Sequence, residues 1–154
     1  MTPEAELLLM NASRAQLVRE VIRPALAAGE IVLCDRFYDS TTAYQGYGRQ
    51  LDLRMVKNIV DVAVGDTRPD LTLLFIVPHE VSEARRVARQ PTLPLPFKRD
   101  RMEEADRSFF TRVAEGYQAI AAAESQRVRQ FDATGEVATT QAAIWELVQP
   151  LLKH

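Results

Sequence analysis

The sequence predicts an α/β protein in which a parallel sheet is covered by helices on both faces. Three short apolar runs, at residues 31–35, 71–77 and 128–131, have the length and composition of buried strands. Segments with helical spacing separate these runs, as expected for a parallel sheet. Three strands are fewer than the about five or six of an average sheet. The sequence therefore predicts one domain, residues 1–154, with an incomplete sheet.

Helical spacing of apolar residues defines the segments between the predicted strands. The first helix is predicted at 4–28, where Gly29 ends it and Pro24 should kink it or end its regular part early. Trp145 follows the period of the last helix and is predicted to pack in the core. The remaining helices are predicted at 51–64, 78–89, 103–125 and 136–152.

Composition excludes several classes of protein. A net charge of -2 argues against a general nucleic-acid binder. No apolar run approaches the length of a membrane span, and the N-terminus lacks the pattern of a signal peptide. Cys34 is the single cysteine, so no intrachain disulfide can form. We therefore expect a cytoplasmic protein without a nucleic-acid or membrane partner.

The first predicted strand leads into DRFYDSTTAYQGYGR, residues 35–49, which is the most informative stretch of the chain. Asp35 ends an apolar strand, as does the Walker B acid that helps to hold magnesium. Arg36 can offer a planar fork of donors to a phosphate. Open α/β sheets bind ligands at this edge. The alternative is a solvated loop in which Asp35 and Arg36 pair only with each other.

The residues that follow suit a nucleoside. A flat ring, an amide and two hydroxyls offer stacking, donors and acceptors, and two glycines allow a ligand to approach the backbone. With so few apolar side chains, the segment is predicted to be a polar loop with little to bury. These residues are Ser40, Thr41, Tyr44, Gln45, Gly46 and Gly48.

Seven cations surround a proline-rich segment, QPTLPLPF, at residues 90–97. Three prolines exclude a regular helix or a central strand there. The segment would suit a cover that closes over a polyphosphate, and the alternative is a solvated basic face. The cations are Arg85, Arg86, Arg89, Lys98, Arg99, Arg101 and Arg107.

Met10 and Arg14 are four residues apart on the first predicted helix and so share a face. A thioether beside a guanidinium could stack on a base and bond its edge. The alternative places Met10 in the core and Arg14 at the surface.

These motifs together resemble bacterial thymidylate kinase (dTMP kinase) over essentially the whole chain. DRFYDSTTAYQGYGR resembles the family's Asp-Arg-Tyr motif, with Phe37 in the tyrosine place. ELLLMNASRAQLVREVIRPAL resembles the helix that reads thymine, KRDRMEE the end of the arginine-bearing lid, and RQFDATGEV the loop beside adenine. The resemblance implies a P-loop NTPase-type three-layer α/β/α fold with a parallel sheet, as in nucleoside monophosphate kinases.

The resemblance implies roles on the dTMP side of the site. Arg36 would hold the dTMP phosphate, and Asp35 would lie near Mg²⁺, directly or through water. Arg14 would bond the thymine edge, which Thr41 would face. Tyr44 would pack against the deoxyribose and disfavour a ribose hydroxyl.

Further implied roles concern the pocket walls and ATP. Gln45 would support the dTMP pocket, and Met10 stands where the family has a phenylalanine that stacks on thymine. The lid is expected at 85–101. Catalytic lid arginines over the ATP phosphates would be Arg85, Arg86 and Arg101, and the adenine site would be lined by Asp132 and Ala133.

One family motif is absent. The sequence has no GxxxxGK[ST] loop, and no glycine precedes Gly29. The expected fold therefore lacks its first strands and the P-loop, whose strand lies in the family between the 31–35 and 71–77 strands. We expect a marginally stable chain that either closes this gap or self-associates, with little or no kinase activity.

The implied activity is phosphoryl transfer from ATP to dTMP, giving dTDP and ADP, with Mg²⁺ as cofactor. A homodimer is implied for the full-length protein. Two alternatives stay open: a catalytically dead protein that binds a nucleoside monophosphate, and a related kinase with another base preference, which the residue at Met10 allows.

Overall fold

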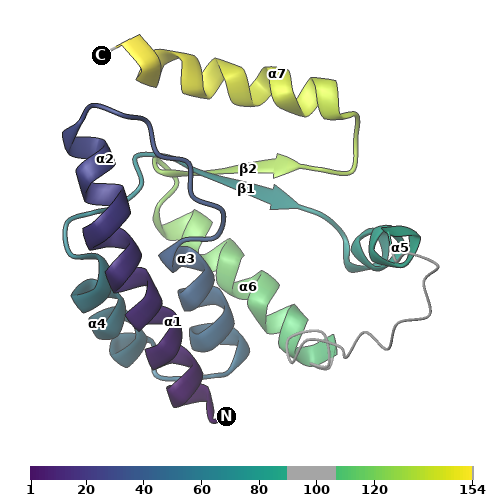
Figure 1. The fold of residues 1–154 in the computed structure, drawn as a ribbon. Coiled ribbons are helices and arrows are strands. Elements are labelled where there is room, and N and C mark those ends of the chain that lie inside the picture. The colour runs from purple at the N-terminus through teal and green to yellow at the C-terminus, as the bar shows by residue number, and fades with distance from the viewer. Residues whose placement is uncertain (90–106, 154) are drawn as a thin grey trace.

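The structure is a computed structural model that describes residues 1–89 and 107–153. Two parallel strands lie between one long helix, α7, and a packed group of helices, which we call the helical group: α1, α3, η2, α4 and α6 (Figure 1). The elements are α1 (Pro3–Leu17), η1 (Val18–Ile22), α2 (Arg23–Ala27), α3 (Tyr38–Thr41), η2 (Thr42–Gly48), α4 (Leu53–Val64), β1 (Thr72–Ile76), α5 (His79–Arg89), α6 (Arg107–Ala123), β2 (Val128–Asp132), α7 (Val137–Val148) and η3 (Gln149–Lys153).

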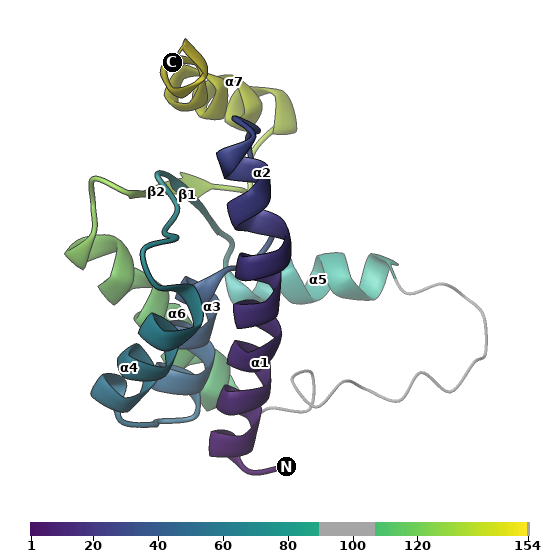
Figure 2. The same ribbon diagram turned by 60° about the vertical axis from the view of Figure 1, so that its left-hand side comes forward.

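The first predicted helix is confirmed, and it passes Pro24 without a break in helical structure. Figure 2 shows α1 and α2 as one continuous rod. The connecting segment η1 is a π-helix, and Pro24 lies in the first turn of α2. The wider π turn accommodates the proline, which lacks an N–H and crowds the preceding turn. Gly29, at a φ of 78°, follows the helix end.

The predicted strand at 31–35 is wrong, whereas the other two are confirmed. β1 pairs with β2 in parallel, from Thr72 opposite Val128 to Ile76 opposite Asp132. No strand of the described chain lies beside residues 31–35, so their backbone has no ladder to join. Ile31 is 69% exposed.

The helices α4 and α7 differ in how many of their residues are buried. α4 is capped by Asp52, whose carboxylate accepts hydrogen bonds from two backbone N–H groups at 2.9 Å. It ends before Gly65, as predicted. α7 contains no buried residue, and Trp145 is 53% exposed. The prediction that Trp145 packs in the core is therefore wrong. So is the prediction of a sheet buried on both faces, because Phe75 is 50% exposed.

Two apolar clusters form the core, and both border α3 and η2. One joins α1 and α4, and the other joins η2 and α6 to the start of β2. The first cluster contains Leu7, Val18, Ile22, Tyr38, Val56, Val60, Ala63 and Val64, and the second Ala43, Phe109, Val113, Ile120, Ala121 and Val128.

None of the helices in the described ranges is long and apolar enough to cross a lipid bilayer.

Candidate functional site

The segment after Arg36 is helical and largely buried, which corrects the prediction of a polar loop with little to bury. It forms α3 and η2 between the two apolar clusters. Tyr44 packs edge-on against Phe109 and Tyr117, with ring centroids at 6.0 and 6.4 Å. Burial on both sides therefore holds the polar side chains in place. The buried residues are Tyr38, Asp39, Ser40, Thr41, Ala43, Gln45, Gly46 and Gly48.

Arg36 has an unusual backbone conformation. Its φ is 61°, in the left-handed region that a non-glycine residue seldom adopts. Its guanidinium lies 4.4 Å from the centre of the Tyr44 ring. Among the described residues no ion pair joins it to the exposed Asp35, so the alternative in which these two side chains only pair with each other is wrong. Such local strain is typical of functional positions.

Arg14 reaches from α1 to the segment that carries Arg36. Its guanidinium donates to Thr41 Oγ1 at 2.7 Å and to the Phe37 carbonyl at 3.3 Å. Burial lowers the pKa of Arg14, while electrostatic interactions with Cys34 and Asp39 act in the opposite direction. Arg14 is thus a half-buried cation at the start of α3, not a surface side chain.

Met10 lies one helical turn before Arg14 and is 46% exposed. The alternative that assigned Met10 to the core is therefore wrong. Its thioether and the Arg14 guanidinium share the face of α1 that meets the 37–41 turn.

Gln45 belongs to a buried network rather than to an open surface. Its amide donates to Glu6 Oε1 at 2.8 Å, and Arg49 forms an ion pair with Glu6 Oε2 at 3.1 Å. Both Gln45 and Glu6 are less than a tenth exposed. The network fixes α1, which carries Met10, against η2.

Sequence reasoning missed several polar residues that support the site. Tyr117 on α6 hydrogen-bonds Ser40 through the two hydroxyls at 2.9 Å, and burial raises the pKa of Tyr117. Asp39 forms a buried ion pair with Arg127 at 2.8 Å. Glu6 could have been found as a charge within the apolar face of the first helix. Asp39 and Arg127 are 88 residues apart, and no sequence pattern links them.

The predicted adenine loop begins at the end of β2. The Ala133 N–H donates to the Ile76 carbonyl at 3.0 Å, which joins the loop to β1. Asp132 Oδ1 accepts from the Thr134 hydroxyl and backbone N–H, and these bonds lower the pKa of Asp132. Asp132 Oδ1 is thus engaged within the loop itself.

The lid prediction falls mostly outside the described residues. Arg85 lies exposed on α5. The side chain of Arg86, residues 90–106 and with them Arg101 lie outside what the structure describes.

Within residues 1–89 and 107–153, no three His, Cys, Asp or Glu side chains form a group that could hold a metal. Asp35, which is exposed, therefore belongs to no such group within these residues.

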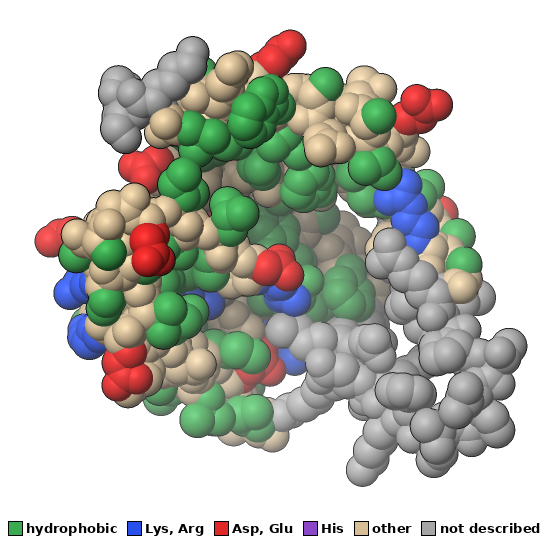
Figure 3. All heavy atoms as spheres, turned by 45° about the horizontal axis from the view of Figure 1, so that its top comes forward, with side chains coloured by type: hydrophobic (Ala, Val, Ile, Leu, Met, Phe, Trp, Pro, Cys, Tyr) green, Lys and Arg blue, Asp and Glu red, His purple; other side chains and the backbone are tan. Residues whose placement is uncertain are grey.

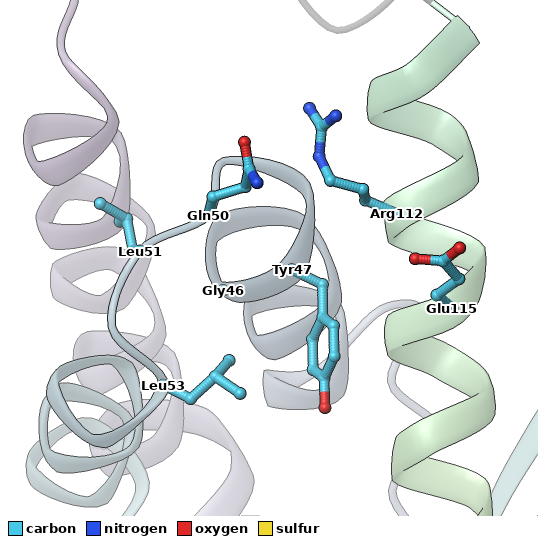
Figure 4. Close-up of a pocket in the computed structure, with 7 residues that line it drawn as sticks. All are labelled: Gly46, Tyr47, Gln50, Leu51, Leu53, Arg112 and Glu115. Atoms are coloured by element: carbon cyan, nitrogen blue, oxygen red, sulfur yellow. The ribbon is translucent and has the colours of Figure 1, made fainter.

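An open cavity of about 250 Å³ lies between η2 and α6 (Figure 4). Arg112, on its wall, donates to the Gly48 carbonyl from two nitrogens at 3.0 and 3.1 Å. Of the residues predicted to suit a nucleoside, Gly46 lines this cavity, whereas Thr41, Tyr44 and Gln45 do not. It is lined by Gly46, Tyr47, Gln50, Leu51, Leu53, Arg112 and Glu115.

Comparisons with known proteins agree with this geometry. The family model described as thymidylate kinase matches residues 1–144. The chain is 48% identical over 151 residues to a thymidylate kinase of Synechococcus sp. strain JA-2-3B'a(2-13), covering 98% of this chain and 68% of that protein. It is 46% identical over 154 residues to a thymidylate kinase of Pseudomonas fluorescens, covering 100% of this chain and 70% of that protein.

Solved structures give the same result. The crystal structure of thymidylate kinase from Ehrlichia chaffeensis superposes with a TM-score of 0.72 at 26% identity, covering 97% of this chain and 66% of that one. The fold is therefore the α/β fold of these enzymes, as predicted, although this chain spans about two thirds of the length of its relatives. The matched length and identity show that the chain belongs to the thymidylate kinase family.

Proposed function

We propose that this chain provides the dTMP site of a kinase that transfers the γ-phosphoryl group of ATP to dTMP, giving dTDP and ADP. One observation carries the proposal. Arg36 is held in a strained backbone conformation, stacked on Tyr44, at the start of the turn that Arg14 grips through Thr41. The Arg36 guanidinium, the Tyr44 ring and the Thr41 hydroxyl thus all belong to one short segment. This combination of a cation, a ring and a hydroxyl suits a nucleoside monophosphate.

Arg36 is proposed to bind the dTMP phosphate. A guanidinium can bind two phosphate oxygens at once, and that of Arg36 lies over the Tyr44 ring, 4.4 Å from its centre. Tyr44 itself is held by Phe109 and Tyr117. The ring is therefore rigid enough to pack against a deoxyribose and exclude a 2′-hydroxyl.

Arg14 and Thr41 are proposed to read the base. Because Arg14 donates to Thr41 Oγ1, the hydroxyl proton of Thr41 is available to another acceptor. A pyrimidine carbonyl is such an acceptor. Met10, exposed on the same helix face, would cover the base, and Gln45 would hold the wall of the pocket.

Asp35 is proposed as the protein ligand for Mg²⁺. Mg²⁺ in phosphoryl-transfer sites keeps several waters and uses one or two carboxylates together with substrate phosphates. One exposed carboxylate next to Arg36 fits that donor set. The ion would neutralise charge on the transferred phosphoryl group.

The part of the site that binds ATP is proposed to be formed by the lid, residues 85–101, and by the loop that follows β2. Arg85, Arg86 and Arg101 would contact the phosphates, and the backbone of Asp132 and Ala133 would line the adenine. Transfer requires donor phosphates held in line with the acceptor, and the sequence has no GxxxxGK[ST] loop to hold them. We therefore expect this chain to bind dTMP with little or no turnover.

The second candidate is a protein that binds a nucleoside monophosphate without transferring phosphate, and the absence of a GxxxxGK[ST] loop favours it. Calorimetric titration tests the dTMP site that both candidates share, and an assay for dTDP separates the two. Selective dTMP binding without binding of Mg²⁺–ATP is expected from this chain. Measurable dTDP formation in a coupled assay would favour the kinase and contradict our expectation of low turnover.

Arg36→Ala tests the proposal directly. Loss of a charge-assisted contact to phosphate should weaken dTMP binding by about 10- to 100-fold. Arg54→Ala is the matched control, because Arg54 is an exposed arginine on α4. Equal affinities of wild type and Arg36→Ala would contradict the proposal. Titrations with dUMP and dCMP would show whether Met10 accompanies another base preference.

A further inference from the structure

The turn that carries Arg36 and Thr41 is the start of a longer helical segment and has no cap of its own. α3 continues directly into η2, but Phe37 before α3 makes no side-chain capping bond. An uncapped helix start leaves backbone N–H groups without partners, which costs stability. The unfavourable φ of Arg36 adds to the cost. A contact from outside the segment must therefore hold its shape.

Asp39 makes that contact. It lies three residues after Arg36 and two before Thr41, and it is 7% exposed. Both carboxylate oxygens accept a hydrogen bond from Arg127 at 2.8 Å, and Oδ2 also accepts from Thr72 Oγ1 at 3.2 Å. The middle of the turn is thus fixed to the starts of β1 and β2.

Arg127 uses all three of its nitrogens within this cluster. Nε donates to Glu124 at 2.8 Å, and Nη1 donates to Thr72 Oγ1 at 2.6 Å in addition to Asp39. Its guanidinium also lies 5.3 Å from the centre of the Tyr38 ring. Burial disfavours the charged form, but the bonds to Asp39 and Glu124 prevail and raise the pKa of Arg127. The side chain is 13% exposed and stays charged.

For the contact with Asp39, the forked, planar geometry of the Arg127 guanidinium matters more than its positive charge. An arginine can bind both oxygens of one carboxylate in a fixed plane, whereas a lysine offers a single point charge. Such a bidentate bond fixes the orientation of Asp39 as well as its position. The positions of Thr41 and Arg36 depend on this orientation of Asp39, because the three residues lie close together in the chain.

We propose that Arg127 is a positioning residue for monophosphate binding: through its bidentate bond to Asp39 it holds Arg36 and Thr41 in the geometry that receives the nucleotide. Arg127 does not touch the nucleotide. The inference rests on the proposed dTMP binding. It adds a requirement at a residue to which the proposed function assigns no ligand contact.

The test compares dTMP affinity with local order at a temperature where each variant is folded. Arg127→Met removes the fork from the buried site, and Arg127→Lys retains the charge alone. We expect both to weaken dTMP binding by about 10-fold or more, as loss of a supporting residue does. Hydrogen exchange of residues 36–41 should rise in both. Thr72→Val should give the same pattern, with a smaller change in affinity.

Lys57→Met is the matched control, because it breaks an exposed ion pair to Asp61 on α4. It should change neither affinity nor exchange. If wild type binds dTMP and the folded Arg127→Lys variant binds it equally well, the positioning role is wrong and the proposed function stands. If wild type binds no dTMP, the proposed function fails, and this inference fails with it. Should Arg127→Met not fold, Arg127→Lys and Thr72→Val decide the outcome.

Discussion

The helical group and the sheet region, which consists of residues 30–35, β1, β2 and α7, are packed to different degrees. In the helical group Leu7 and Val56 are fully buried, and polar networks such as Glu6 with Gln45 lie inside. In the sheet region Leu33 is 93% exposed and α7 buries no residue. The dTMP-side residues lie in or beside the well-packed part. We therefore expect acceptor binding to depend on the helical group and on its contacts with Thr72 and Arg127, at the starts of β1 and β2, and less on the exposed remainder of the sheet region.

The space-filling view shows the consequence for the surface. Apolar side chains gather along α7 and around the hollow beside it (Figure 3). Large apolar surfaces of this kind are seldom left exposed on a monomer. We therefore expect the sheet region to be the source of any self-association.

Leu7→Ala should have the largest effect and tests whether the helical group carries the stability. Leu7 is fully buried on α1, so truncation leaves a cavity, and we expect a loss of about 3–5 kcal/mol in the free energy of unfolding. Leu8→Ala, at a 56% exposed neighbour, should change it by less than about 0.5 kcal/mol. Urea unfolding followed by circular dichroism measures both. Similar losses would contradict the comparison.

Sequence patterns predicted the helices and two of the strands because these depend on local spacing and caps. α4 ends before Gly65 as expected, and it starts at Leu53, close to the predicted residue 51. The strand at 31–35 could not be judged from its own residues, because a strand exists only beside a partner. For the same reason the exposure of Trp145 did not follow from its helical period.

The residues of the candidate site also divide into those that the sequence predicted and those that it did not. Arg14, Thr41, Arg36 and Tyr44 were identified from residue type and motif, and the structure joins them in two pairs. Their supports were not identified, since pairs such as Asp39 with Arg127 depend on contacts between distant segments. The polar composition of 35–49 predicted an open loop, but the two apolar clusters enclose it.

Gly116→Ala tests how closely the helical group is packed. A Cβ at Gly116 would lie 2.8 Å from Tyr47 Cγ, which is closer than two carbon atoms can approach. Even with the better helix propensity of alanine, we expect a loss of about 1–3 kcal/mol. Gly135→Ala, before α7, has nothing within 4 Å of the added atom. Thermal unfolding should show a lower midpoint for Gly116→Ala alone, and equal midpoints would show looser packing than the structure has.

Leu33→Ser should have the smallest effect on stability, with a change within about 0.5 kcal/mol, because the side chain is already 93% exposed. Its effect on association should be larger, since it removes apolar surface from the sheet region. Sedimentation velocity over a range of protein concentrations would measure this. Leu8→Ser removes a comparably exposed leucine from the helical group and should leave association unchanged. If Leu8→Ser reduced association as much as Leu33→Ser, the contact surface would extend over α1, beside Met10 and Arg14, and self-association would then compete with dTMP.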